Sequence, residues 1–192
     1  TAMPVAGVST PVTAEGFVAV ATAEFVATWM AARGVNADVP LRGSMWPGTV
    51  DMSTGAVSYC AWDSLSYGFA CVEFIRRWCG MRVQMGASDY CDAKAPGLYA
   101  ALEKAYKSAV ITAFTGQPLA SGSGMVEEGR TLSAVQILLD REFASAATHL
   151  TRQFDTIPEN IALDEILQVG IGIGESHLET MHTAKRFRDS LW

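Results

Sequence analysis

The chain has little positive charge and no long apolar run. It contains 14 Lys and Arg against 20 Asp and Glu, a net charge of −6, and its densest basic segment is only 185–188. Nucleic-acid binding needs clustered Lys and Arg, so this composition argues against it. No run approaches the roughly 18–20 apolar residues of a membrane helix. No signal peptide is visible, and we expect a cytoplasmic protein. Because the first residue is Thr1 rather than Met, we expect the N-terminus to be cut.

The spacing of the cysteines argues against a common type of metal site. Cys60, Cys71, Cys79 and Cys91 include no CxxC pair. Structural zinc sites use such pairs, so we expect this chain to bind no metal directly. We expect reduced and mostly buried thiols, as is usual in the cytosol.

What is present is the pattern of a folded α/β domain. The 192 residues are 49% hydrophobic and 18% charged, which allows a real core. Short apolar segments alternate with helical periodicities about every 40 residues, which is typical of βα units and a parallel sheet. We expect strands at 3–8, 39–44, 81–85 and 117–120, and helices at 13–34, 63–79, 97–115, 132–154, 161–169 and 182–192.

Capping residues set the expected helix ends. Thr13 is expected to start the first helix and Asp63 the second, and Gly34, Gly80 and Gly116 are expected to end the first three. The third and fourth helices each carry an apolar stripe: Leu98, Leu102, Ala105 and Ala109, then Leu132, Val135, Leu139, Phe143, Ala146, Leu150 and Phe154.

The fold class is therefore α/β, with two architectures open. Three or four βα units make either half of a (β/α)8 TIM-type barrel or a small open sheet. Half a barrel leaves two parallel edge strands unpaired. We expect residues 1–192 to form a single domain or partial barrel that belongs to a longer chain or forms a homo-oligomer.

Three loops follow expected strands, at 43–55, 86–96 and 121–131. In a parallel barrel such loops gather at one face, where they carry the chemistry. They would assemble an aromatic and acidic mouth, which suits a cationic ligand because aromatic faces bind quaternary ammonium groups. The alternative is a surface tryptophan with solvated acids. The groups concerned are Trp46, Asp51, Asp89, Tyr90, Cys91, Asp92, Lys94, Glu127 and Glu128.

Several segments, in order, match one known family. They are PVAGVSTPVT at 4–13, VDMSTG at 50–55, DAKAP at 92–96, GMVEEGRTLS at 124–133, LLDREF at 138–143, IALDEILQVG at 161–170 and HTAKRFR at 182–188. The chain resembles the trimethylamine methyltransferase (MttB) superfamily, in the pyrrolysine-free branch that includes glycine betaine methyltransferase. The resemblance implies a (β/α)8 barrel much longer than this chain, of which the chain would be the C-terminal half.

The resemblance also implies a reaction. A methyl group would move from an amine to the Co(I) corrinoid of a separate partner protein. In relatives, pyrrolysine is thought to activate a tertiary amine, and its position falls near SDYCD at 88–92, with no such residue here. A quaternary amine leaves as a neutral amine and needs no such help, so a betaine-like substrate is favoured over a tertiary amine.

Roles for individual residues follow from the resemblance and the loop positions. Trp46 and Tyr90 would face the cation, and His177 and Lys94 would orient the polar end of the substrate. The segment 175–177 reads ESH where the family has Gly-His-Phe. The rival hypothesis is a non-catalytic half-barrel that binds a cationic metabolite or a partner chain. The expected catalytic residues are His177 and Asp92, and the expected substrate-binding residues are Trp46, Asp51, Tyr90, Cys91, Lys94 and Glu127.

Overall fold

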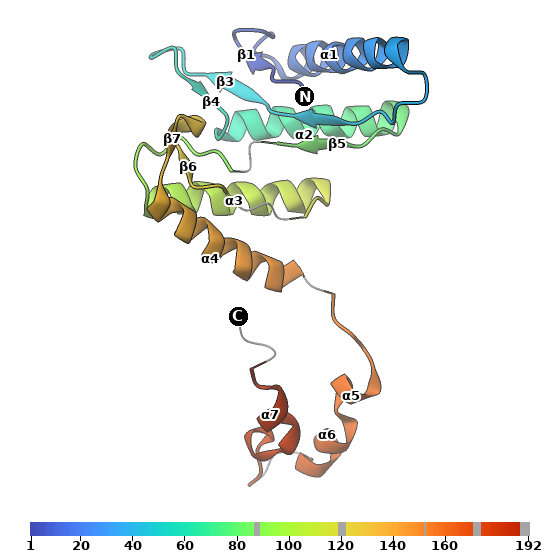
Figure 1. Cartoon of the computed structure of the whole chain (residues 1–192), viewed down its shortest axis with the longest axis vertical. Helices are drawn as coiled ribbons and strands as arrows, with labels where there is room; N and C mark the ends of the chain where they lie inside the picture. The colour runs from blue at the N-terminus through green and yellow to red at the C-terminus, as the bar shows by residue number, and fades with distance from the viewer. Residues whose placement is uncertain (87–88, 119–121, 152, 171–173, 189–192) are drawn as a thin grey trace. The chain divides into compact units, whose positions relative to one another are not determined.

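The computed structural model forms two compact units, Thr1–Ala144 and Ser145–Trp192, which are described separately. The described residues are 1–86, 89–118, 122–151, 153–170 and 174–188 (Figure 1).

The first unit holds most of the secondary structure. Its elements are β1 (Val5–Ala6), α1 (Ala14–Val35), β2 (Gly43–Met45), β3 (Gly48–Val50), β4 (Val57–Ser58), α2 (Trp62–Cys79), β5 (Val83–Met85), α3 (Leu98–Thr115), β6 (Met125–Val126), η1 (Glu127–Gly129) and β7 (Thr131–Leu132). Helix α4 (Ala134–Thr151) begins in this unit and ends in the second.

Two strand pairs are parallel, whereas β4 pairs antiparallel with β3 and β7 pairs antiparallel with β6. β2 pairs in parallel with β5, from Gly43 opposite Val83 to Met45 opposite Met85. β1 pairs in parallel with β3, and a parallel bridge joins Ala2 to Met45. The parallel pairing of β2 with β5, with helix α2 between them in the chain, agrees with an α/β fold. The half-barrel itself stays a prediction.

The core is formed mainly by α1, α2, β2 and β5, which are neighbours in Figure 1. Phe17, Phe25, Met45 and Ile75 are at most 2% exposed and form one cluster from α1, β2 and α2. Gly43 is needed for this packing, because a Cβ there would lie 2.6 Å from the ring of Phe25. Each such side chain stabilises the fold by about 1.5–3 kcal/mol through burial.

Helix α1 is long and apolar enough, by length and composition alone, to cross a membrane, against our expectation of no such run. Its buried face, which includes Phe17, Ala21 and Phe25, packs in the core of the first unit. Core helices of globular domains can have the same length and composition, so these features of α1 are weak evidence for a membrane span.

Three of the expected helix ends are confirmed. The hydroxyl of Thr13 caps α1 by accepting the N–H of Gly16. Gly80 and Gly116 end α2 and α3 with φ of 71° and 69°, in the left-handed region that glycine adopts without strain.

Two expected caps are wrong. α1 continues through Gly34 to Val35, and its C-cap is Asn36. Asp63 lies inside the first turn of α2, which begins at Trp62. For α2 the reason is local, because the hydroxyl of Ser58 in β4 already accepts the N–H groups of Cys60 and Ala61, the two residues before the helix.

The expected apolar stripe of α3 is not its buried face. Leu98 and Leu102 are 78% and 58% exposed, whereas Lys104 and Lys107 are 2% and 0% exposed. In α4, the expected stripe residue Val135 is likewise 59% exposed. The buried lysines reach acceptors on other segments, so hydrogen bonding adds to the burial of Ala100 and Ile111 in fixing the orientation of α3.

Two expected loops contain strands, and one expected strand is absent from the described part of its segment. β3 lies within the expected loop 43–55, and β6 lies within the expected loop 121–131. At 117–118 the described chain is not a strand, and 119–120 lies outside the described residues. Instead, the side chain of Gln117 accepts from the N–H of Met85 and donates to its C=O.

The second unit is mainly short helices. They are α5 (Pro158–Ile161), α6 (Leu163–Val169), η2 (His177–Glu179) and α7 (Met181–Arg186). The helix expected at 161–169 is confirmed as α6, which a left-handed residue, Ala162 with φ of 53°, separates from α5. The expected last helix is α7, and 189–192 lies outside the described residues.

Candidate functional site

Three aromatic rings meet near the carboxyl ends of the parallel strands β2 and β5. Trp46 follows β2 directly, Tyr90 lies in the loop after β5, and Tyr59 follows β4. The rings of Trp46 and Tyr90 lie edge to face at 4.9 Å, and those of Tyr59 and Tyr90 at 6.2 Å. All three side chains are half-buried. We call Trp46, Tyr59 and Tyr90 the aromatic cluster.

Glycines leave room for two of these rings. A Cβ on Gly86 would overlap the indole nitrogen of Trp46. A Cβ on Gly129 would lie 2.8 Å from Cζ of Tyr90. Any side chain at either position would displace a ring, so the cluster depends on both glycines.

The Trp46 indole also has a fixed polar partner. Its Nε1 donates to Oγ of Ser44 at 3.1 Å, which places both side chains on the same face of the strand. Ser44 is opposite Gln84 in β5, so the exposed Gln84 side chain shares that face. Met45 is buried on the other face of β2, whereas the face that carries Ser44 and Trp46 is exposed to solvent at Gln84.

A left-handed turn brings a carboxylate to the cluster. Glu127, Glu128 and Gly129 have φ of 55°, 57° and 84°. Left-handed backbone costs about 1–2 kcal/mol for a residue with a side chain. Two backbone hydrogen bonds hold the turn: the N–H of Glu127 donates to the C=O of Ala93, and the N–H of Glu128 donates to the C=O of Cys91. Such strain is often found at functional positions.

The carboxylate of Glu128 acts electrostatically on the aromatic cluster. Its side chain is only 9% exposed, with Arg130 at 3.8 Å and itself 66% exposed. Burial raises the pKa of Tyr59, and the negative charge of Glu128 raises it further. A nearly buried carboxylate beside aromatic rings is an arrangement that favours a positive charge.

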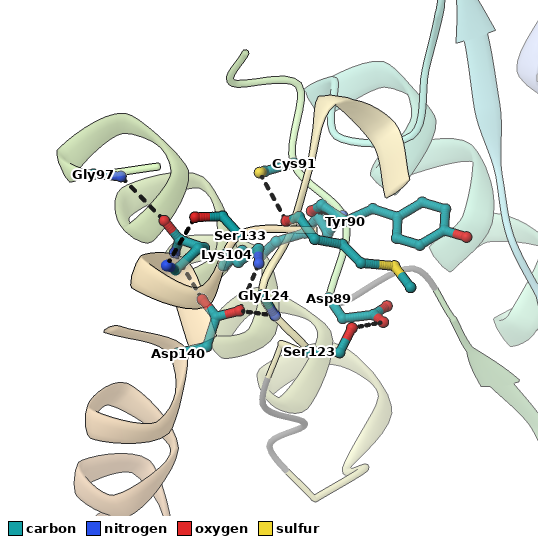
Figure 2. Close-up of polar contacts among 12 residues, drawn as sticks. Asp89, Tyr90, Cys91, Gly97, Lys104, Ser123, Gly124, Ser133 and Asp140 are labelled. Carbon is teal, nitrogen blue, oxygen red and sulfur yellow. Dashed lines mark hydrogen bonds and ion pairs between the residues drawn. The ribbon is translucent and has the colours of Figure 1, made fainter. Parts of the chain in front are cut away.

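A buried polar network holds the segment that carries this turn. Figure 2 shows Lys104 of α3 against Asp140 of α4, with Nζ and Oδ2 2.6 Å apart. The same oxygen accepts the N–H of Gly124 at 2.8 Å, and Oδ1 accepts from Gln136 at 2.8 Å. Gln136 in turn accepts the N–H of Gly97. The network ties the start of the segment 124–133 to both helices.

Of the expected site residues, the structure brings Trp46 and Tyr90 together. Cys91 is fully buried, its thiol donates to the C=O of Met125, and burial raises its pKa. Lys94 lies 3.8 Å from Glu127 at the outer side of the left-handed turn, where 68% of the lysine side chain is exposed. Their substrate-binding roles stay predictions.

Asp92 joins two loops behind the cluster. Its Oδ2 accepts from the hydroxyl of Ser58 at 2.5 Å, which links the start of α2 to the loop after β5. Its N–H donates to Glu103 at 2.8 Å. Its Oδ1 is buried with no hydrogen-bond partner among the described residues. The catalytic role of Asp92 stays a prediction, while its contacts are those of a link between loops.

Asp51 and His177 belong to different units, and each is described in its own surroundings. Asp51 is exposed, and hydrogen bonds from Ser53 and Thr54 in its own turn lower its pKa to about 2. His177 is exposed at the start of η2 in the second unit, where its C=O accepts from the hydroxyl of Thr180. Their site roles stay predictions.

Sequence reasoning missed Tyr59 and did not separate Glu128 from the other acids of the loops. Tyr59 follows an antiparallel strand, β4, that no pattern in the sequence indicated. The sequence places Glu128 among the acids of the loops. Its position beside the aromatic cluster depends on the left-handed turn, which the sequence does not indicate. Among the described residues, no three or more His, Cys, Asp and Glu side chains are grouped as a metal site would require.

The fold and the site together define a class. A parallel strand pair joined through a helix, with aromatic side chains at its carboxyl end, is an arrangement found in α/β enzymes that carry their site on βα loops. No curated protein matches the chain. The sequence model of the family described as trimethylamine methyltransferase (MTTB) matches residues 1–192, and the chain belongs to this family. Membership of the family, which is one of methyltransferases, is thereby confirmed. The pyrrolysine-free branch and the C-terminal half of a barrel stay predictions.

Proposed function

We propose that this protein takes a methyl group from a quaternary ammonium compound, of betaine type, and passes it to the corrinoid of a partner protein. The observation that carries the proposal is the aromatic cluster with the nearly buried carboxylate of Glu128 beside it. Membership of the methyltransferase family gives the type of reaction. The substrate and the corrinoid partner are the proposed parts.

The cluster has the chemistry to hold a methylated cation. Each aromatic face that contacts such a cation contributes about 0.5–2 kcal/mol. A quaternary ammonium group donates no hydrogen bond, so it loses none when aromatic rings replace its water. Glu128 adds a negative charge in a site of low exposure, where Coulomb attraction is stronger than in water.

A quaternary substrate also simplifies the reaction. When the C–N bond breaks, its electron pair stays on nitrogen and the amine leaves neutral, so no proton donor is required. The corrinoid, as the second substrate, supplies the electron pair that accepts the methyl group. The residues of this chain then have to orient the C–N bond and exclude water. The face that carries Trp46 is open at Gln84, so a partner could approach along it.

Binding of tetramethylammonium, choline and glycine betaine by calorimetry tests the cation site. We expect Trp46→Leu to weaken tetramethylammonium binding by about 2- to 30-fold. Trp78→Leu is the matched control, because Trp78 is 57% exposed on the far part of α2 and should leave affinity unchanged. Choline should bind better than 3,3-dimethyl-1-butanol, its neutral isostere; equal binding would refute a cation site.

Glu128→Gln separates charge from shape. It should weaken tetramethylammonium binding and bring the pKa of Tyr59 down toward its usual value, because the carboxylate is one cause of its rise. Ultraviolet titration of tyrosinate, compared with Tyr59→Phe, measures this. Methyl transfer from each amine to free cob(I)alamin tests the reaction. Cation binding without transfer would favour the non-catalytic binding module.

A further inference from the structure

Lys107 is a buried cation with an unusual set of partners. Its side chain is 0% exposed, and no carboxylate of the described residues lies within ion-pair distance. Its Nζ donates to the C=O of Tyr90 at 2.7 Å, to Sγ of Cys60 at 3.2 Å and to the C=O of Tyr59 at 3.5 Å. An ammonium has three N–H donors, and here each has an acceptor.

Most of the acceptors belong to the aromatic cluster. Two of the three are backbone oxygens of cluster residues, one from the segment after β4 and one from the loop after β5. The Cys60 thiol donates to the same Tyr90 oxygen at 3.2 Å. The Tyr106 hydroxyl, next to Lys107 in α3, donates to the C=O of Cys60 at 2.5 Å. Helix α3 thus holds both backbone segments from behind the rings.

The thiol in this set is neutral. Burial raises the pKa of Cys60 to about 12, with Lys107 lowering it and Asp92 and Glu103 raising it. Cys60 can therefore accept from the lysine through sulfur while donating its proton to Tyr90. Burying an ammonium is costly unless every N–H has an acceptor. The buried Lys107 therefore stabilises those arrangements of the Tyr59–Cys60 segment and of Tyr90 in which all three acceptors face Nζ.

We propose that Lys107 is the positioning residue of the aromatic cluster, which fixes the backbones of Tyr59 and Tyr90 and thereby the arrangement of their rings. The inference about ring positions stands on the hydrogen bonds alone. Its consequence for ligand affinity rests on the proposed function. Lys104, one turn earlier on α3, shows the contrast, since it is buried against the carboxylate of Asp140 and bonds to neither tyrosine.

The test reads the rings directly and needs no ligand. The chain has five tyrosines, so ¹³C-tyrosine labelling gives few NMR signals, assigned with Tyr59→Phe and Tyr90→Phe. In the wild type, the Tyr90 ring should be shifted by the ring current of Trp46. Lys107→Met keeps an unbranched apolar stem, one atom shorter than that of lysine, but donates no hydrogen bond. It should move both tyrosine signals toward those of exposed tyrosine.

Ile111→Ala is the matched control for lost stability. Ile111 lies one turn further along α3, is 3% exposed and belongs to the main core cluster. It should lower the melting temperature yet leave the signals of Tyr59 and Tyr90 in place. Unchanged signals in Lys107→Met would overturn the proposal. If Lys107→Met does not fold, Lys107→Gln is read instead, and loss of folding in both would assign the lysine a purely structural role.

Tetramethylammonium binding, measured on the same variants, separates the two proposals. We expect Lys107→Met to weaken it by about tenfold and Ile111→Ala to leave it unchanged. If the wild type binds no tetramethylammonium while Lys107→Met still shifts both rings, the proposed function fails and the positioning role stands. If the wild type binds and Lys107→Met alters neither rings nor affinity, the positioning role fails alone.

Discussion

Gly86→Ala is the sharpest perturbation that the structure offers. The added Cβ would overlap Nε1 of Trp46, and no small shift of the indole relieves an overlap of that size. The ring must leave its place, or the backbone after β5 must move. Either change breaks the edge-to-face contact with Tyr90 and the hydrogen bond to Ser44.

The expected loss follows from these two contacts. An aromatic pair contributes about 0.5–1.5 kcal/mol and a hydrogen bond about 0.5–1.5 kcal/mol, so Gly86→Ala should destabilise by about 1–3 kcal/mol. Affinity for tetramethylammonium should fall by about 2- to 30-fold, the contribution of one aromatic face. Urea unfolding followed by circular dichroism and calorimetric binding measure the two effects.

Gly34→Ala is the matched control because it makes the same chemical change in open space. A Cβ at Gly34 meets no atom within 4 Å, and the residue lies inside α1. Alanine there should stabilise by about 0.5–1 kcal/mol through helix propensity. The reasoning is refuted if Gly86→Ala is as stable as Gly34→Ala and binds the cation as well as the wild type does.

Three further predictions concern the rest of the first unit. Lys104→Met leaves Asp140 buried without its cation, so it should lower the free energy of unfolding by about 3–5 kcal/mol in the same urea assay. The pKa of Asp51 is lowered to about 2, so its charged form stabilises the turn above pH 3.8, and this stabilisation is lost as the pH falls toward 2. The NMR signal of the Ser53 amide should therefore titrate with a midpoint of about 2. A midpoint at the usual value of 3.8 would contradict the prediction. Cys79 is the exposed thiol, so iodoacetamide should alkylate it alone in the native protein and all four cysteines in denaturant, as counted by mass spectrometry.

Helix ends were predictable where a single residue decides them. Thr13 and Gly80 act through their own side chain or backbone freedom, whereas Gly34 lies inside α1 and shows that glycine alone does not end a helix. The start of α2 was not predictable from Asp63, because Ser58 in a strand accepts the N–H groups before the helix. That strand is two residues long and leaves no periodic signal.

The orientation of α3 could not be predicted from hydrophobic periodicity. The method assumes that apolar residues are buried, and here Lys107 is buried instead of Leu98. The acceptors that allow this are mainly backbone carbonyl oxygens, which a sequence does not display. Only the folded arrangement brings them around the amine.

The candidate site was predictable in part for the same reason. Trp46 and Tyr90 were found because loops that follow parallel strands converge at one end of a sheet. Tyr59 enters from an antiparallel strand, and Glu128 through a left-handed turn of residues that rarely adopt one. Both depend on the shape of the backbone, which the residue types alone do not specify.

The contact between Gln117 and Met85 has a further consequence for the sheet. The side-chain amide offers one donor and one acceptor, and it occupies the outward N–H and C=O of Met85 at 2.6 and 3.2 Å. An amide so placed imitates the peptide group of an adjoining strand. Unpaired edges are where chains join sheet to sheet and aggregate. At Met85, a residue outside any strand thus supplies protection against that association.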